Sequence, residues 1–481
     1  MLIGRESEKK IINDMILSKK AEFMAVYGRR RIGKTFLIRD CCSNNNCFYV
    51  EITGVKDGKL KKQLGIFTKS LAKFFYGDAL LKEPTTWEEA FERLTNEIKK
   101  ITGKKIVVFF DELPWMATKR SRLIQALDYY WNTSWSKINN CKIIVCGSAA
   151  SWILDNLINA KGGLHNRLTK TLLLKPFDLR TTKLFLEANG HKLNEKQVLD
   201  TYMAIGGIPF YLEQLQPALS VNQNINNICF GENGLLREEF PRLFKSLFNN
   251  AEIISKIIKA IASKRYGMSR EELLLKIKSK SGGWINDRIE ELESAGFITC
   301  FIPYGYKKDV HYRIIDEYTM FYLKWIAPEI KQGYGFSKSH WLDVSASSAT
   351  KSWFGYAFEN VCFKHLEQIK KALGLENIHC NVASWKLIPK KGENIDGAQI
   401  DLLFDRADNS ITLCEIKYTE TGKFRIDKDY AKNLLNKIDV FASATKTKKQ
   451  IFLAIISIDG IEKNLYANDL VQHEVKLRDL F

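Results

Sequence analysis

The sequence predicts an α/β protein with a parallel sheet, followed by smaller domains. Five short apolar runs are typical of buried strands. They occupy residues 22–28, 47–52, 105–110, 142–147 and 170–174. Helical patterns alternate with these runs, over residues 33–42, 58–76, 87–100 and 121–131. Because strands that alternate with helices form βαβ units, this order indicates a parallel sheet.

The charge of the chain favours a polyanionic partner. The sequence has 73 lysines and arginines against 55 acidic residues, a formal net charge of +18. A protein this basic attracts phosphate-rich polymers, so DNA is the first partner to consider. The alternative is a basic surface that serves only solubility.

Composition also limits the class of protein. Hydrophobic residues make up 45% of the chain and aromatic residues 12%, which excludes general disorder. No apolar run approaches the roughly 20 residues of a membrane helix, and the start, MLIGRESEKK, lacks a signal-peptide pattern. The ten cysteines lack the spacing of a zinc site. We therefore expect a soluble cytoplasmic protein with reduced thiols and no membrane partner.

Changes in pattern divide the chain into four predicted parts. Their ranges are 1–175 (the parallel-sheet domain), 176–248 (a helical lid), 249–330 (a winged helix-turn-helix) and 345–481 (a second α/β domain). The third rests on three helical patterns followed by two short strands, and Ser269 with Glu272 forms a capping box in its second helix. Residues 331–349, rich in Gly, Ser and Lys, read as a linker.

The first predicted strand runs into a complete phosphate-binding motif, GxxxxGK[ST]. The segment consists of Gly28, Arg29, Arg30, Arg31, Ile32, Gly33, Lys34 and Thr35. Glycines let backbone N–H groups surround phosphate oxygens, and the helix that follows adds the positive end of its dipole. Lys34 would reach the β- and γ-phosphates, and the Thr35 hydroxyl would bind Mg²⁺. A chance glycine loop is the alternative. The flanking strand and helix favour a nucleoside triphosphate site for ATP.

A second apolar strand ends in two carboxylates, in the Walker B pattern. Asp111 and Glu112 follow the run at 105–110. Ligands of open parallel sheets bind at the carboxyl ends of strands, so the two carboxylates should lie near the phosphates. Asp111 would hold Mg²⁺ and Glu112 would polarise the attacking water.

With these motifs, residues 1–330 resemble the archaeal and bacterial ATPases of the AAA+ and STAND-like P-loop superfamily. The stretch Ile3-Gly4-Arg5-Glu6 is similar to the family's entry motif. The resemblance implies that Ser148 senses the γ-phosphate. It also implies that Arg167 acts on a nucleotide, either its own or that of a neighbouring subunit in a homo-oligomer; a solvated surface charge is the alternative for Arg167. Residues 206–209 resemble the glycine-proline turn of the lid, although the sequence favours a structural turn alone.

A second group of charged residues lies near the end of the chain. Asp401 belongs to one predicted strand, and Glu415 and Lys417, two residues apart, share one face of the next. A turn at 408–410 would bring Asp401 across from them, and Glu359 in a helical pattern supplies a further carboxylate. Carboxylates could hold a divalent ion that activates water beside a phosphodiester, while the lysine stabilises the transition state.

Glu359, Asp401, Glu415 and Lys417 together resemble the PD-(D/E)XK nuclease superfamily, over about residues 350–460. The resemblance implies a restriction-endonuclease-like domain with Mg²⁺ or Mn²⁺ bound by Glu359, Asp401 and Glu415. Ile400 stands where the superfamily pattern has proline, a departure that does not affect the chemistry. The alternative is a charged hairpin at a sheet edge.

Two main functions remain open from the sequence, beside a transcription regulator that uses the winged helix, which would leave the acidic hairpin unexplained. One is an ATP-gated or ATP-driven DNA nuclease, serving defence against foreign DNA or genome maintenance. The other is a nucleotide switch that binds DNA or a partner protein without cutting. Basic residues of the winged helix would contact DNA phosphates in either case. They are Lys276, Lys278, Lys280, Arg288, Lys307 and Lys308.

Overall fold

The computed structural model describes residues 2–159, 167–248, 250–278, 283–332, 337–389 and 396–481. Contacts divide the chain into two compact units. Unit 1 comprises Met1–Pro176, Leu247–Asn249 and Asp287–Gly296, and unit 2 comprises Phe177–Ser246, Asn250–Asn286 and Phe297–Phe481. No helix in the described part of the chain has both the length and the hydropathy to cross a membrane.

Unit 1 is an α/β unit with a parallel five-stranded sheet, which confirms the predicted fold class for this part. The strand order is β2-β3-β4-β1-β5, and every pair is parallel. The strands are β1 (Glu22–Tyr27), β2 (Phe48–Thr53), β3 (Ile106–Asp111), β4 (Cys141–Gly147) and β5 (Lys170–Leu173). The helices between them are α1 (Glu6–Leu17), α2 (Lys34–Asn44), α3 (Leu60–Phe75), α4 (Trp87–Lys100), α5 (Leu113–Met116), α6 (Leu123–Thr133) and α7 (Ala150–Ile153).

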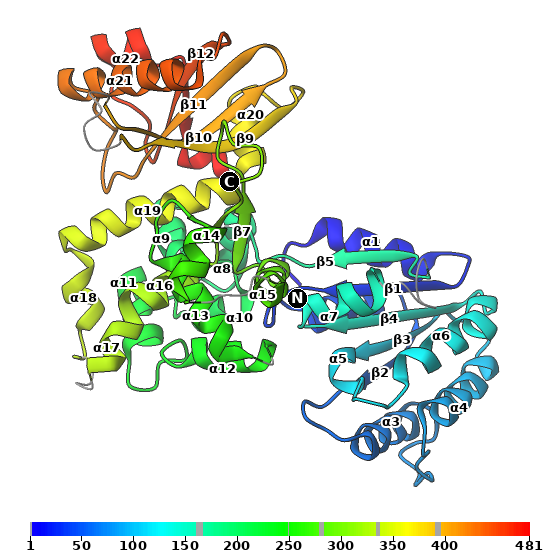
Figure 1. Ribbon diagram of the computed structural model, residues 1–481. Helices are drawn as coiled ribbons and strands as arrows, with labels where there is room; N and C mark the ends of the chain where they lie inside the picture. Colours follow the sequence, from blue (N-terminus) through cyan, green and yellow to red (C-terminus); the bar gives the residue numbers. More distant parts are fainter. Residues whose placement is uncertain (1, 160–166, 249, 279–282, 333–336, 390–395) are drawn as a thin grey trace. The chain divides into compact units, whose positions relative to one another are not determined.

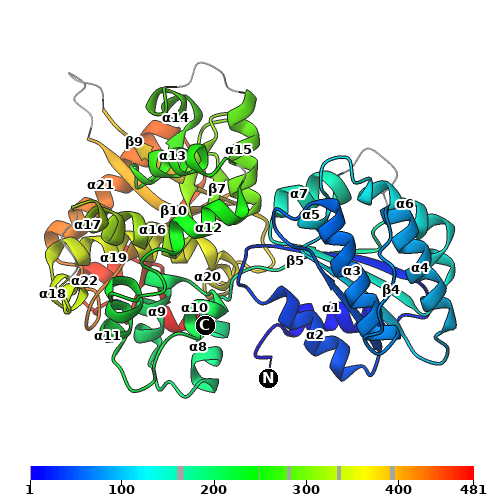
Figure 2. The same ribbon diagram turned by 90° about the horizontal axis from the view of Figure 1, so that it is seen from below.

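Helices cover both faces of this sheet. Helices α1 and α2 pack together on one face, and α3, α4 and α6 cover the other (Figures 1 and 2). The second face carries a large aromatic core, in which Phe91 contacts Phe110 and Trp135 edge to face. Because both faces are covered, the three central strands β1, β3 and β4 are buried along nearly their whole length and are mainly apolar instead of alternating, which made them recognisable from sequence.

The strand order decides which loops meet. Strand β4 lies between β1 and β3, so the loops after all three strands emerge side by side at the carboxyl edge. The phosphate-binding motif follows β1, the acidic pair ends β3, and Ser148 follows β4. Three predicted site segments that are far apart in the sequence therefore share one edge of the sheet.

The first part of unit 2 is helical. It contains α8 (Leu179–Ala188), α9 (Glu195–Ile205), α10 (Pro209–Leu212), α11 (Val221–Ile225), the π-helical turn η3 (Asn226–Phe230) and α12 (Glu239–Leu247), whose last residue belongs to unit 1. A capping box of Asn194 and Gln197 starts α9. Helix α16 (Glu317–Phe321) packs on α9, and the π-helical turn η4 (Tyr322–Ile326) and α17 (Ala327–Gln332) continue from α16.

The predicted linker at 331–349 is in part a packed helix. Helix α18 (His340–Ser345) lies within it, and the Trp341 side chain is fully buried. The Trp341 ring stacks on Phe230 at 5.7 Å and meets Phe321 edge to face at 4.9 Å. The linker prediction is therefore wrong for these residues, because one buried aromatic side chain anchored a stretch whose composition suggested a loop.

A small antiparallel sheet with strand order β6-β8-β7 follows the helical part. Its strands are β6 (Met268–Ser269), β7 (Ile298–Phe301) and β8 (His311–Ile314), and its helices are α13 (Ala251–Ala262), α14 (Arg270–Lys276) and α15 (Gly283–Ser294). The Ser269–Glu272 capping box that the sequence predicts starts α14. The predicted helices and strand pair are present, and β6 is an additional short strand.

The end of the chain forms a mixed sheet with strand order β13-β12-β11-β10-β9. The strands are β9 (Cys380–Leu387), β10 (Ala398–Arg406), β11 (Ser410–Lys417), β12 (Gln450–Ser457) and β13 (His473–Lys476). Strands β10 and β11 form the predicted hairpin, and Asn409 in its turn has φ 63°. The helices are α19 (Ser348–Lys364), α20 (Leu366–Ala372), α21 (Lys428–Thr445) and α22 (Leu465–Leu470); α21 and α22 pack together (Figure 1).

Gly207 shows why the turn at 206–209 needs glycine. A Cβ atom at Gly207 would lie 2.0 Å from the carbonyl oxygen of Phe177, and the Phe177 N–H donates to the Gly207 carbonyl at 2.7 Å. We expect Gly207→Ala to lower the free energy of unfolding by about 3 kcal/mol, because backbone atoms must move. Thermal unfolding would measure this loss. Gly355→Ala is the matched control: the site is helical and open, so alanine should stabilise it by up to about 1 kcal/mol. Equal stability of the Gly207 variant and the wild type would contradict the expectation.

Candidate functional site

The loop after β1 adopts the conformation that its glycines permit. Gly28 has φ 137° and Gly33 has φ 88°, values that L side chains rarely adopt. A Cβ atom at Gly28 would lie 2.2 Å from the Leu174 carbonyl oxygen, so the chain has no space for a side chain there. Gly33 is the residue before α2, and Lys34 and Thr35 form the first turn of that helix. The loop therefore delivers both side chains to the carboxyl edge of the sheet.

The Lys34 side chain is buried, and its ammonium donates hydrogen bonds to other groups of the protein. Its Nζ donates to the carbonyl oxygens of Gly28 at 2.9 Å and Arg29 at 3.0 Å, and to Ser148 Oγ at 3.2 Å. Burial lowers the pKa of Lys34, although the nearby acidic groups, Glu112 among them, oppose this effect. A buried cation held mainly by neutral carbonyl and hydroxyl groups is well suited to take a phosphate as its counter-charge.

Thr35 and Asp111 meet between α2 and β3. The Thr35 hydroxyl donates to Asp111 Oδ2 at 3.0 Å, and Cys146 Sγ donates to Asp111 Oδ1 at 2.8 Å. Burial raises the pKa of Cys146 well above its usual value, and the charge of Asp111 adds to this, so the thiol stays protonated and remains a donor. A hydroxyl and a carboxylate side by side are hard oxygen ligands, which fit Mg²⁺.

Glu112 and Ser148 are the third group of predicted site residues at the carboxyl edge of the unit 1 sheet. Both groups of Ser148, its backbone N–H and its hydroxyl, donate to the Glu112 carboxylate, the N–H at 3.0 Å. Glu112 has φ 51°, a left-handed conformation that turns its side chain away from the strand direction. Ser148 thus bridges the cation of Lys34 and the carboxylate of Glu112, and the sequence alone could not reveal this bridge.

The remaining predicted residues of this site differ in placement. Arg29 and Ile32 are buried, while Arg30 and Arg31 are half-buried. Arg5 from the predicted entry motif donates to the Ile32 carbonyl at 3.4 Å, so it contacts the phosphate-binding loop. Arg167 is exposed in the turn before β5 and makes no ion pair among the described residues. Its neighbour Asn166 lies outside the described residues.

The C-terminal hairpin brings Glu415 against two lysines and a tyrosine. Glu415 is buried, and it pairs with Lys417 at 2.9 Å and with Lys437 at 2.7 Å. The Tyr430 hydroxyl donates to Glu415 Oε1 at 2.6 Å. Burial alone would raise the pKa of Glu415, but the two lysines outweigh it and the pKa is lowered. Glu415 is therefore ionised, and its carboxylate forms ion pairs with two lysines of the protein.

The charge of Glu415 affects the pKa values of two further carboxylates, Asp401 and Glu359. Asp401 accepts hydrogen bonds from the Ile416 N–H at 3.2 Å and from Gln399 at 3.0 Å. Burial raises the pKa of Asp401, and repulsion by Glu415 adds to it. Burial and repulsion by Asp401 raise the pKa of Glu359 to about 8. Carboxylates that repel one another in a buried site are the usual electrostatic signature of a place for a cation.

As they stand, these side chains do not form a metal site. Within the described ranges, no three His, Cys, Asp or Glu side chains converge closely enough to hold an ion. Sequence reasoning missed Tyr430 and Lys437, which lie seven residues apart on one face of α21. It also missed Arg313 of β8, which is buried beside Phe363 and whose charge acts on Glu359 and Asp401. Only packing brings these residues to the hairpin, since neither motif nor spacing marks them.

The basic residues predicted to contact DNA are mostly exposed. Arg288 is half-buried and pairs with Glu291 at 2.9 Å, so it is less available than predicted. Lys280 lies outside the described residues. The other four lysines are exposed. Lys276 ends α14, Lys278 lies just after it, and Lys307 and Lys308 lie in the turn between β7 and β8.

Comparison with known proteins finds similarity to a family of ATPase domains in the first part of the chain. Residues 2–215 match a family described as an ATPase domain predominantly from Archaea. An uncharacterised protein of Methanocaldococcus jannaschii is 25% identical over 406 residues, covering 82% of this chain and 83% of that protein. Among solved structures, a Walker-type ATPase of Pyrococcus abyssi has a TM-score of 0.49 at 18% identity, covering 67% of this chain and 96% of that one. The ORC2 protein of Aeropyrum pernix, solved as ADPNP–ADP complexes, has a TM-score of 0.44 at 13% identity, covering 69% and 95%. Residues 2–215 are therefore similar to an ATPase domain found predominantly in Archaea.

Proposed function

We propose that this protein binds and hydrolyses ATP with Mg²⁺ at the carboxyl edge of the unit 1 sheet, and that it acts on DNA through unit 2. The contacts between the phosphate-binding loop and the strand ends carry the first proposal: Lys34 to Ser148, Ser148 to Glu112, and Thr35 to Asp111. Thr35 and Asp111 would hold a metal ion there, and that ion would supply positive charge against the phosphates.

Each side chain at this edge has a proposed role. Lys34 would exchange its carbonyl partners for the β- and γ-phosphates, a gain because its present acceptors are mostly neutral. Thr35 and Asp111 would hold Mg²⁺. Glu112 would orient and polarise the attacking water, with Ser148 as the link that senses whether a γ-phosphate is present. Arg167, which is exposed, would complete the charge at the phosphate from its own or a second subunit.

The second proposal is a metal-dependent nuclease of the PD-(D/E)XK type at the C-terminal hairpin. Its support is electrostatic: burial, with added repulsion among Glu359, Asp401 and Glu415, raises the pKa of Glu359 and Asp401. Oxygen ligands of this kind suit Mg²⁺ or Mn²⁺. The metal would supply an activated water. Lys417, which contacts Glu415 at 2.9 Å, would stabilise the phosphodiester as its charge grows.

One observation favours a different function for the same domain. Lys437 and Tyr430 both donate hydrogen bonds to the Glu415 carboxylate, and Lys437 also forms an ion pair with it. A metal ion must therefore displace Lys437 before it can bind Glu415. If Lys437 stays in place, the hairpin is a structural ion-pair cluster. The protein would then be a nucleotide-dependent switch that binds DNA or a partner protein without cutting.

The two functions separate in one assay. Supercoiled plasmid is incubated with the full-length protein in Mg²⁺ or Mn²⁺, with ATP, with ADP and without nucleotide. We expect nicked and linear DNA in at least one metal and nucleotide state, and phosphate release that depends on Mg²⁺. Phosphate release without any nicking in every state would favour the non-cutting switch.

DNA binding through the region of β6, β7 and β8 should depend strongly on salt. The proposed contacts are exposed lysines that bind phosphates, each releasing about one counterion. We expect the affinity for a 30-base-pair duplex to fall by at least about 100-fold between 50 and 200 mM salt, with little sequence preference. Lys307→Gln with Lys308→Gln should flatten the salt dependence, measured by fluorescence anisotropy. Lys192→Gln, an exposed lysine of the helical part, is the control. Binding that ignores salt would contradict the proposal.

A further inference from the structure

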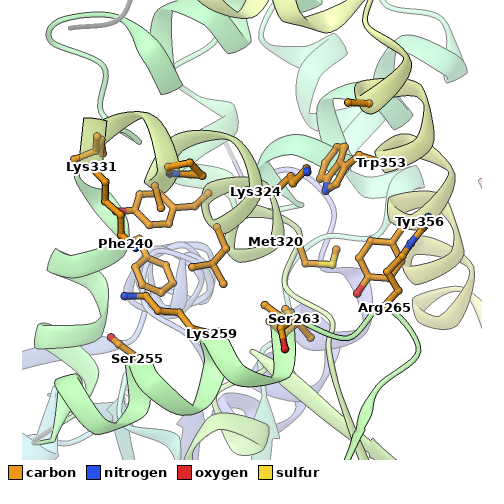
Figure 3. Close-up of a pocket in the computed structure, with 18 of the residues that line it drawn as sticks. Phe240, Ser255, Lys259, Ser263, Arg265, Met320, Lys324, Lys331, Trp353 and Tyr356 are labelled. Carbon is orange, nitrogen blue, oxygen red and sulfur yellow. The ribbon is translucent and has the colours of Figure 1, made fainter. Parts of the chain in front are cut away.

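A pocket of about 930 Å³ lies in unit 2 and includes none of the residues assigned to the nucleotide or carboxylate sites. Its walls come from α12, α13 and the residues after it, the continuous stretch α16–η4–α17, and α19 (Figure 3). The volume is near the upper end of the range for small-molecule sites, about 300–1,000 Å³. The pocket therefore has room for a ligand larger than a single nucleotide.

The lining of the pocket is basic. Among the residues that the structure describes, four cations and no acidic residue line it: Lys259, Arg265, Lys324 and Lys331. Lys259 and Lys331 lie in the left part of Figure 3, and Arg265 lies in the right part, so positive charge reaches two sides of the pocket. Within the described ranges, none of the three lysines forms an ion pair. A ligand with several negative charges would be attracted from both sides.

The remaining lining is aromatic and apolar. The Phe240 ring stacks on Tyr322 at 4.6 Å and 9°, and both line the pocket. Trp353 and Tyr356 line the wall formed by α19, and the Arg265 guanidinium lies 5.1 Å from the Tyr356 ring centre. Arg265 also donates to the Ser352 carbonyl at 3.1 Å, which fixes it at the rim. Phe240, Tyr322 and Trp353 are largely buried, but the parts of them that line the pocket lie beside cations, which favours a ligand that combines a planar ring with phosphate.

We propose that this pocket binds a small nucleotide ligand, of up to two nucleotides, at a site separate from the phosphate-binding loop of unit 1. The bases would pack on the aromatic walls, and the phosphates would pair with the lysines and Arg265. The proposal does not require the C-terminal hairpin to cut DNA. It would give the protein a second nucleotide site, formed entirely within unit 2.

The test uses full-length Lys34→Ala protein, so that the phosphate-binding loop contributes little to nucleotide affinity. ADP and the 5′-phosphorylated dinucleotide pApA are titrated by calorimetry, with inorganic phosphate and a 20-nucleotide single strand as further arms. We expect one site for pApA, bound more tightly than inorganic phosphate by at least about tenfold. Adding Lys259→Gln and Lys324→Gln should weaken pApA binding at least about tenfold. Adding Lys256→Gln, an exposed lysine of α13 outside the pocket, should leave it unchanged.

Three results would overturn the proposal. The first is that neither ADP nor pApA binds the Lys34→Ala protein. The second is that the pocket substitutions leave affinity unchanged, or that Lys256→Gln reduces it equally. The third is a different ligand preference. Binding of the 20-nucleotide strand alone would make the pocket a nucleic-acid surface. Binding of phosphate as tightly as pApA would make the pocket a simple anion site.

Discussion

Lys34→Ala is expected to reduce ATP hydrolysis by at least about 100-fold, the loss typical of removing one electrostatic contact to a transition state. The Lys34 ammonium is buried and lies 3.2 Å from Ser148 Oγ, in the centre of the edge where the phosphates are proposed to bind. Methionine is a second variant, because it keeps most of the volume while removing the charge. Phosphate release measured with Mg²⁺ and saturating ATP gives the rate.

Glu112→Gln separates binding from hydrolysis at the same edge. Glutamine keeps the acceptor for the Ser148 N–H, which donates at 3.0 Å, but it cannot take a proton from water. We expect hydrolysis to fall by about 10²–10⁴-fold, while the affinity for ATP changes little. The far-UV circular dichroism and melting temperature should match the wild type in both variants. If the Lys34 and Glu112 variants hydrolyse ATP at the wild-type rate, the carboxyl edge of the unit 1 sheet is not the ATPase centre.

Under the proposed nuclease function, Glu415→Gln and Asp401→Asn are expected to reduce DNA cleavage by at least about 1,000-fold, because loss of a proposed metal ligand would cost several kcal/mol of transition-state stabilisation. Amide variants are preferred over alanine, since Glu415 accepts a hydrogen bond from Tyr430 at 2.6 Å. Lys417→Met should also lose cleavage while keeping metal affinity, because the proposed role of Lys417 is at the phosphodiester. Nicking of plasmid DNA and calorimetric titration of Mn²⁺ measure the two effects.

The matched control for these variants is Lys449→Gln. Lys449 pairs with Asp405 at 2.6 Å in the same sheet but contacts none of the proposed metal ligands. Its loss should leave cleavage unchanged. Glu415→Gln also leaves Lys437 without its ion pair, so stability must be checked beside activity. If the Glu415 and Asp401 variants cut DNA at the wild-type rate, the hairpin is not the nuclease centre.

Contacts within unit 2 make these controls necessary. The Tyr418 hydroxyl, one residue after Lys417, donates to Asp200 of α9 at 2.9 Å. Lys364 of α19 pairs with the buried Glu317 of α16 at 2.7 Å, and the Leu179 N–H donates to His365 at 3.1 Å. The C-terminal sheet is thus packed on the helical part, whereas the sequence suggested separate domains joined by a linker. A destabilising change at the hairpin can therefore disturb the helical part as well.

The sequence by itself determined the elements whose signals are local. The phosphate-binding loop is one contiguous motif, and the central strands β1, β3 and β4 are mainly apolar because both faces of the sheet are covered there. The Ser269–Glu272 capping box and the turn around Asn409 are likewise set by residues close together in the chain. Such features depend on hydrogen bonds and backbone preferences within a few residues, so they can be read without a fold.

Only the tertiary structure decided which distant side chains meet. Ser148 reaches both Lys34 and Glu112 because β4 lies between β1 and β3, and strand order is not encoded in the periodicity of any one strand. Lys437 reaches Glu415 because α21 packs across the sheet. The helix around Trp341 and the basic pocket likewise arise where several segments pack together. Packing and burial act between residues far apart in the chain, and for that reason these contacts appear only in the folded protein.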